Sequence, residues 1–146
     1  MSRSASDHRG PVVLDTGVFA AELIRSGQPL AELYRPVLEG RPFAISSTTV
    51  AEVRYGAELA GWGIPRRTRL EHQISRSRIV WPGPDLIEIY VELRVRCTRS
   101  GHALGQKVHE ADRWVAATAL WLNVPLVAHD RVFAGIDGLE LLTKLD

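Results

Sequence analysis

The sequence has little of several features that would assign it to a special class of protein. It has one cysteine, Cys97, in 146 residues, which excludes an intramolecular disulfide and fits a reducing compartment such as the cytoplasm. No apolar run is long enough to cross a bilayer, and the polar start lacks the apolar stretch of a signal peptide. We therefore expect a cytoplasmic protein without membrane contact, with a flexible N-terminal tail over residues 1–10 and a single domain over residues 11–146.

Signatures of several common enzyme classes are also missing. There is no glycine-rich phosphate loop, and the hydroxyl residues at 46–49 lack a nucleophile elbow, so acyl transfer is not expected. Cys97, His102 and His109 lack the tight spacing of a zinc site. The net charge of +1 gives no overall attraction to nucleic acid. What remains informative is the position of individual charged residues.

Basic residues gather in two stretches of the chain. The first holds Arg66, Arg67, Arg69, Arg76 and Arg78, and the second holds Arg94, Arg96, Arg99 and Lys107. In the first stretch Glu71 is the only acidic residue among them. Two explanations stay open, which are a solvated helix face and a rim that tracks phosphates around an acidic centre.

Short apolar runs alternate with helical patterns along the chain. The runs predict strands at 11–14, 42–45, 78–81 and 124–128, with an edge strand at 139–142. Apolar periodicity and capping residues predict helices at 16–25, 29–39, 46–60, 66–75, 85–99 and 108–122. This alternation predicts an α/β fold, in which helices cover both faces of a parallel sheet of four to five strands.

Four acidic residues stand where predicted elements begin or end, and these are Asp15, Glu52, Asp112 and Asp130. Asp15 and Asp130 each follow a predicted strand, so they should lie at the same edge of the sheet. Carboxylates at the border of a core repel one another and are costly to desolvate unless a cation lies between them. Oxygen ligands select hard ions such as Mg²⁺ or Mn²⁺. The chemistry such a site serves best is metal-activated attack of water on a phosphodiester.

Each of these acids also has a structural explanation. Asp15 could cap the first helix, and Thr49 with Glu52 matches a capping box. Asp112 could favour the dipole of a helix start, and Asp130 could initiate a turn. Only jointly do the four predict a metal site, because several carboxylates at one edge without a cation would cost several kcal/mol.

The segments around these acids resemble the PIN-domain family, and within it the VapC-type ribonuclease toxins of bacterial toxin–antitoxin pairs. The segments are Val13–Thr16, Thr49–Gly56, Asp112–Ala119 and Pro125–Leu139. The third is the most specific match. Together they extend over nearly the whole chain beyond the first ten residues, in the family's order.

The resemblance implies a three-layer α/β/α PIN-like fold and an endoribonuclease that depends on Mg²⁺, with Mn²⁺ as a substitute. It implies that Asp15 and Asp112 are the metal ligands, while Glu52 and Asp130 orient waters or hold a second ion. It further implies an RNA substrate, inhibition by a cognate antitoxin protein, and a homodimer that joins the antitoxin in a hetero-oligomer. The predicted helices between residues 16 and 39 would offer the antitoxin a groove.

The closing segment departs from the family pattern at two positions. Ala128 stands where the family often has Thr or Ser, and Val132 stands where a further Asp is frequent. Both departures bear on the second metal position. They leave open a catalytically weak PIN-like module that binds RNA or protein. A metal-dependent phosphatase is the other alternative, although that chemistry usually has a second Asp where this chain has Gly17.

Overall fold

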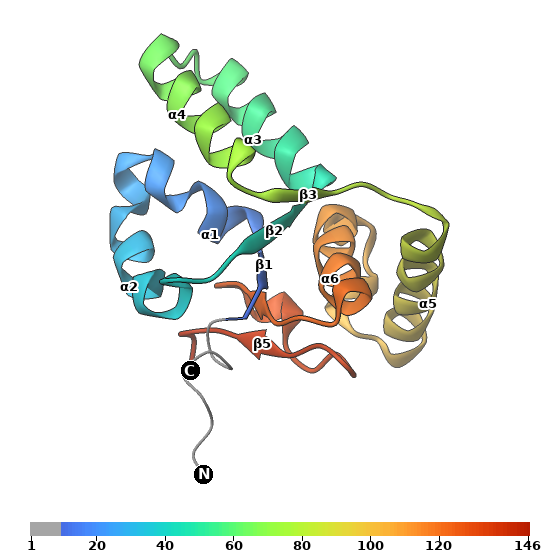
Figure 1. Ribbon diagram of the computed structural model, residues 1–146. Coiled ribbons are helices and arrows are strands. Elements are labelled where there is room, and N and C mark those ends of the chain that lie inside the picture. The colour runs from blue at the N-terminus through green and yellow to red at the C-terminus, as the bar shows by residue number, and fades with distance from the viewer. Residues whose placement is uncertain (1–9) are drawn as a thin grey trace.

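The computed structural model describes residues 10–146 and has a five-stranded sheet at its centre (Figure 1). The strands are β1 Val12–Leu14, β2 Phe43–Ser46, β3 Arg78–Val80, β4 Leu126–Val127 and β5 Leu141–Leu142. Their order is β3-β2-β1-β4-β5, and every neighbouring pair is parallel. The predicted parallel α/β sheet is therefore confirmed. The tail expected at residues 1–10 lies, up to residue 9, outside the described residues.

Six α-helices and five short 3₁₀ turns connect these strands within the described residues. The helices are α1 Thr16–Ala20, α2 Gln28–Leu38, α3 Ser47–Leu59, α4 Ile64–Ser75, α5 Pro84–Ser100 and α6 Glu110–Leu122. The 3₁₀ turns are η2 Ala21–Leu23, η3 Arg25–Gly27, η4 Ala103–Gly105, η5 Lys107–His109 and η6 Arg131–Phe133. Over residues 10–146, no helix combines the length and apolar character needed to span a membrane.

The sequence marks the ends of several helices. The Ser46 hydroxyl caps α3 by accepting a 3.1 Å hydrogen bond from the backbone N–H of Thr48. Pro84 begins α5, where its missing N–H costs nothing. The same helix ends at Gly101, whose φ of 73° is the left-handed conformation that glycine adopts without strain. Asn123 ends α6 in a similar conformation, with a φ of 56°.

The two faces of the sheet pack against different helices, which gives three layers. Because side chains alternate along a strand, Val13 contacts a core built with α5 and α6, whereas Val12 and Leu14 contact a core built with α1 to α4. Figure 1 shows α5 and α6 on one side of the strands and α1 and α2 on the other. Because helices cover both faces, the strands of this parallel sheet are apolar on both sides.

Helices α3 and α4 form a hairpin that extends away from the sheet in Figure 1. Arg54 on α3 donates two hydrogen bonds, of 3.0 and 2.8 Å, to the carboxylate of Glu71 on α4. Arg67 makes a second ion pair with Glu58 between the same helices. The base of the hairpin is apolar, with Leu70 and Ile74 buried against the sheet.

The predicted helix at residues 16–25 is wrong in its second half. Helix α1 ends at Ala20, and two 3₁₀ turns follow, separated by Ile24 in an extended conformation. The chain folds back so tightly that a Cβ on Gly27 would lie 2.5 Å from the carbonyl oxygen of Ala21. A continuous helix cannot make that approach, and only glycine permits it.

Smaller differences concern the other boundaries. The helix predicted from residue 108 begins at Glu110, because residues 107–109 form a 3₁₀ turn. The two strands predicted at 124–128 and 139–142 each contain only two residues.

Candidate functional site

The four predicted acids lie at the edge of the sheet where its strands end. Asp15 follows β1 and is buried, with 9% of its surface exposed, at the N-cap position of α1. Asp130 lies three residues beyond β4, and Asp112 is in the first turn of α6. Glu52 is on α3, which follows β2. Helix α6 contacts both β1 and α3, so the sheet edge brings the segments that carry three of these acids together.

The electrostatic state of Asp15 shows that the other three acids act on it. Its pKa rises from 3.8 to about 7, chiefly because burial disfavours the charged carboxylate. The negative charge of Asp112 raises it further, the backbone N–H of Thr16 opposes the rise, and Asp130 and Glu52 then add smaller increases. The fold therefore places three other carboxylates within electrostatic reach of a buried one.

Two threonine hydroxyls fix the position of Glu52. The Thr16 hydroxyl donates a 2.8 Å hydrogen bond to Oε1 of Glu52, and it lies 2.8 Å from the hydroxyl of Thr49. Since the single Thr16 proton goes to Glu52, the fully buried Thr49 donates to Thr16. The capping-box explanation of Glu52 is therefore wrong. Ser46 is the N-cap of α3, and Glu52 lies more than one turn inside the helix.

The other two acids have their own partners. Oδ2 of Asp112 lies 2.8 Å from Nδ1 of His109, the residue just before α6. Sequence reasoning missed this pair, although the three-residue spacing at a helix start was a usable signal. Oδ1 of Asp130 accepts a 2.9 Å hydrogen bond from the backbone N–H of Val132, so the predicted turn is confirmed.

The donor set fits a hard divalent ion that keeps part of its water shell. The groups around Asp15 are carboxylates and hydroxyls, which suit Mg²⁺ and Mn²⁺. Within residues 10–146 no group of three or more His, Cys, Asp or Glu side chains is arranged so that it could hold a metal ion. Mg²⁺ does not require such a group, because it is usually bound through one or two carboxylates and several waters. A cation beside Asp15 would also lower the raised pKa of its carboxyl group.

Three arginines of α4 donate hydrogen bonds to backbone carbonyl oxygens. Arg66 donates to the carbonyl of Leu23 at 3.3 Å, and Arg69 donates to that of Glu22 at 3.1 Å. Arg67 donates to the carbonyl of Trp62 at 2.6 Å. For these three residues the contacts favour a structural role, because they attach α4 to neighbouring turns.

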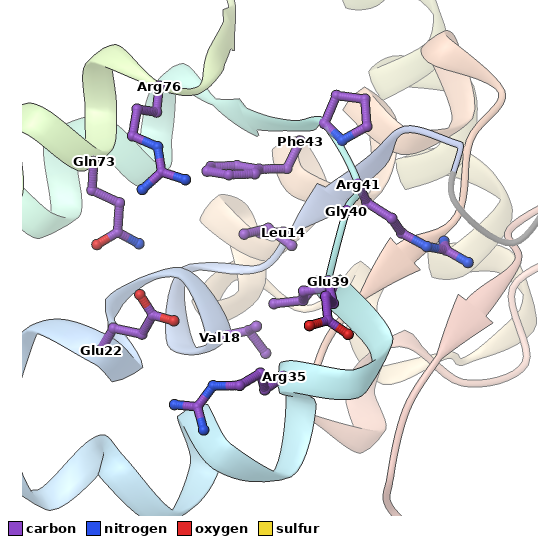
Figure 2. A pocket seen from close by; sticks show the side chains of 12 residues that line it. Leu14, Val18, Glu22, Arg35, Glu39, Gly40, Arg41, Phe43, Gln73 and Arg76 are labelled. Atoms are coloured by element: carbon purple, nitrogen blue, oxygen red, sulfur yellow. The ribbon is translucent and has the colours of Figure 1, made fainter. Parts of the chain in front are cut away.

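A cavity of about 480 Å³ lies between α1, α2, α4 and the start of β2. Leu14, Val18 and Phe43 give it an apolar lining, and Figure 2 shows their side chains between charged and polar groups from the helices. These groups include Glu22, Arg35, Gln73 and Arg76. Leu14 connects the two sites along the chain, since it lines the cavity and directly precedes Asp15.

Comparisons with known proteins agree with this geometry. Residues 12–139 match the model of the PIN domain family. The chain is 30% identical to Ribonuclease VapC5 of Mycobacterium tuberculosis over 128 residues, which are 86% of this chain and 87% of that protein.

Two solved structures extend the similarity. VapBC2 from Rickettsia felis, bound to a DNA fragment from its promoter, matches with 25% identity and a TM-score of 0.68, covering 91% of this chain and 98% of that one. VapBC-5 from M. tuberculosis, a member of the VapBC family of toxin–antitoxin systems, matches with 26% identity and a TM-score of 0.62, covering 91% and 96%. The chain belongs to the PIN domain family and is similar to its VapC-type ribonucleases.

Proposed function

We propose that this protein is a Mg²⁺-dependent endoribonuclease of the VapC type, a toxin whose activity a cognate antitoxin inhibits. The observation that carries the proposal is the convergence of Asp112, Asp130 and Glu52 on the buried Asp15. Such a cluster is unfavourable by itself and becomes useful with a divalent ion. The similarity to a named ribonuclease over 86% of the chain supports RNA as the substrate class.

Each acid has a distinct role in this proposal. Asp15 and Asp112 hold the ion, and His109 keeps the Asp112 carboxylate in place. Glu52, fixed by the Thr16 hydroxyl, and Asp130 orient the attacking water or hold a second ion. When bound, Mg²⁺ supplies a more acidic water and stabilises the departing oxygen of the phosphodiester.

Metal-dependent cleavage of RNA tests the enzyme assignment. We expect the purified protein to cleave structured RNA with Mg²⁺ and not with EDTA. Asp112→Asn should lower the rate about 100-fold or more while the protein stays folded, because a metal ligand contributes several kcal/mol to catalysis. Glu71→Gln on the α3–α4 hairpin is the matched control and should leave the rate unchanged. Cleavage that persists in EDTA, or that survives Asp112→Asn, would rule out the mechanism.

The cavity of Figure 2 is the proposed groove for a segment of the antitoxin. Its apolar lining suits side chains of a partner peptide, and its charged rim offers both signs of charge. VapBC complexes among the similar structures support an antitoxin partner and a hetero-oligomer. The homodimer stays a prediction, as does a cytoplasmic location, where the buried Cys97 would remain a free thiol.

A basic side chain of the antitoxin that reaches the acidic site would compete with the metal by charge alone. We therefore expect excess Mg²⁺ to weaken inhibition of RNA cleavage by the antitoxin at fixed ionic strength. The control replaces Mg²⁺ with Na⁺ at the same ionic strength. Inhibition that is equally strong at all Mg²⁺ concentrations would contradict this competition.

The two alternatives predict different results in the same cleavage assay. A PIN-like binding module would bind RNA or protein without cleaving RNA at any Mg²⁺ concentration. A phosphatase would hydrolyse phosphomonoesters and leave RNA intact. Gly17 offers no acid to such a reaction, although the place where its Cβ would lie is 3.8 Å from Oδ2 of Asp15.

A further inference from the structure

Tyr34 is a fully buried tyrosine in the middle of α2, and neither the proposed catalysis nor the proposed groove uses it. Its ring packs edge-on against the ring of His129, with centroids 5.5 Å apart and an angle of 83°. His129 is the residue before Asp130. A buried hydroxyl next to an acidic site needs hydrogen-bond partners, and those of Tyr34 come from distant parts of the chain.

The Tyr34 hydroxyl joins three segments of the chain. It lies 2.8 Å from Nδ1 of His129 and 3.2 Å from the carbonyl oxygen of Ala128, both just beyond β4. Beyond β5 it accepts a 2.8 Å hydrogen bond from the backbone N–H of Lys144 and lies 3.3 Å from the hydroxyl of Thr143. One phenolic oxygen therefore connects α2 with the ends of two strands.

These contacts begin where the backbone hydrogen bonds between β4 and its neighbouring strands end. Strand β4 has only two residues, and its backbone bonds at this end are Asp15 N–H to the Val127 carbonyl at 3.0 Å and Ala128 N–H to the Leu142 carbonyl at 3.3 Å. The next residue, His129, leads directly to Asp130. Directly after this end of β4, the Tyr34 hydroxyl contacts Ala128 and His129.

We propose that Tyr34 is a positioning residue for Asp130, an inference that rests on the proposed function. Its hydroxyl holds Ala128 and His129 so that the following carboxylate faces Asp15. Asp130 directly follows these two residues beyond β4, and Asp15 directly follows the neighbouring strand β1 at the same edge of the sheet. Tyr34 touches neither the RNA nor the metal. It acts through the two residues before Asp130.

The test is Tyr34→Phe, which removes one oxygen and keeps the buried ring. We expect kcat for RNA cleavage to fall about 10- to 100-fold with KM little changed, and Mn²⁺ affinity to fall about tenfold, as losses of supporting hydrogen bonds at metal sites do. Measurements are made well below the melting temperature of each variant. Tyr55→Phe is the matched control, because this tyrosine is 67% exposed on α3, and it should change neither quantity.

A double-mutant cycle separates positioning from general loss of structure. If Tyr34 acts through Asp130, adding Tyr34→Phe to Asp130→Asn should change the Mn²⁺ dissociation constant by less than about twofold. A full additional loss in that background would overturn the inference, because Tyr34 would then act independently of Asp130. Unchanged Mn²⁺ affinity and kcat in Tyr34→Phe alone would also overturn it.

The same measurements distinguish this inference from the proposed function. A wild-type protein that binds Mn²⁺ but cleaves no RNA would contradict the ribonuclease assignment. The double-mutant cycle, measured by Mn²⁺ affinity, would still decide the role of Tyr34. A wild-type protein that neither binds Mn²⁺ nor cleaves RNA would overturn both.

Discussion

Two carboxylates of this molecule, Asp15 at the sheet edge and Glu71 on the α3–α4 hairpin, have opposite environments. Burial chiefly, and then the charges of Asp112, Asp130 and Glu52, raise the pKa of Asp15 to about 7. Glu71 is half exposed and accepts two hydrogen bonds from Arg54, which lower its pKa.

The two regions differ in whether the surroundings of the carboxylate favour its charged form. On the hairpin every strong contact of Glu71 favours its charged form, as in an ordinary surface ion pair. At the sheet edge burial and like charges both disfavour the charged form of Asp15. Carboxylates whose charged form is destabilised in this way are concentrated at functional sites. A bound ligand of opposite charge offsets the unfavourable free energy.

The largest expected effect concerns the pH dependence of stability without metal. Because the folded pKa of Asp15 is raised above 3.8 to about 7, the folded state holds a proton that the unfolded state releases. In EDTA, stability should therefore fall as the pH rises from about 4 to about 7, by as much as a few kcal/mol. Asp15→Asn should remove this fall and make the protein more stable than wild type at pH 8, as measured by urea unfolding.

The smallest expected effect is that of the matched substitution on the hairpin. Glu71 has a lowered folded pKa, so its contribution is present at neutral pH and is lost as the pH falls through that value. Glu71→Gln should reduce stability at pH 8 by less than about 1 kcal/mol, because the pair with Arg54 is half exposed. The two substitutions thus change stability in opposite directions. If Asp15→Asn destabilised the protein at pH 8, the claim that the sheet edge disfavours a charged carboxylate and the hairpin favours one would be contradicted.

Much of the site could be predicted from local patterns. Strand β1 is a short apolar run, and in a parallel sheet the residue that follows it must lie at the carboxyl edge. That argument gave the position of Asp15, and the same argument gave that of Asp130. The role expected of Asp112 came from the family resemblance, because its place near a helix start was explained by the helix dipole alone.

The rest depends on contacts between distant residues, which local patterns do not contain. Thr49 and Glu52 have the spacing of a capping box, but Ser46 caps the helix and the Thr16 hydroxyl donates to Glu52, so Glu52 has a different role. Gly27 lies just beyond the helix predicted at residues 16–25, and its close approach to Ala21 depends on how the segment folds back.

The network of Tyr34 is the clearest case of a contact that the sequence could not reveal. The residues that its hydroxyl reaches are 94 to 110 positions away. In the sequence Tyr34 is one apolar position of a helix, and His129 is a lone histidine beside an acid. Only the packing of α2 beside the ends of β4 and β5 brings them together.

The most direct test of the central claim is anomalous diffraction from a crystal of this protein soaked in Mn²⁺. A shared cation at the sheet edge predicts an anomalous peak between the carboxylates of Asp15 and Asp112, which Asp15→Asn should abolish. A crystal without a peak at this edge, or with Asp15 and Asp112 turned away from a peak elsewhere, would contradict the account.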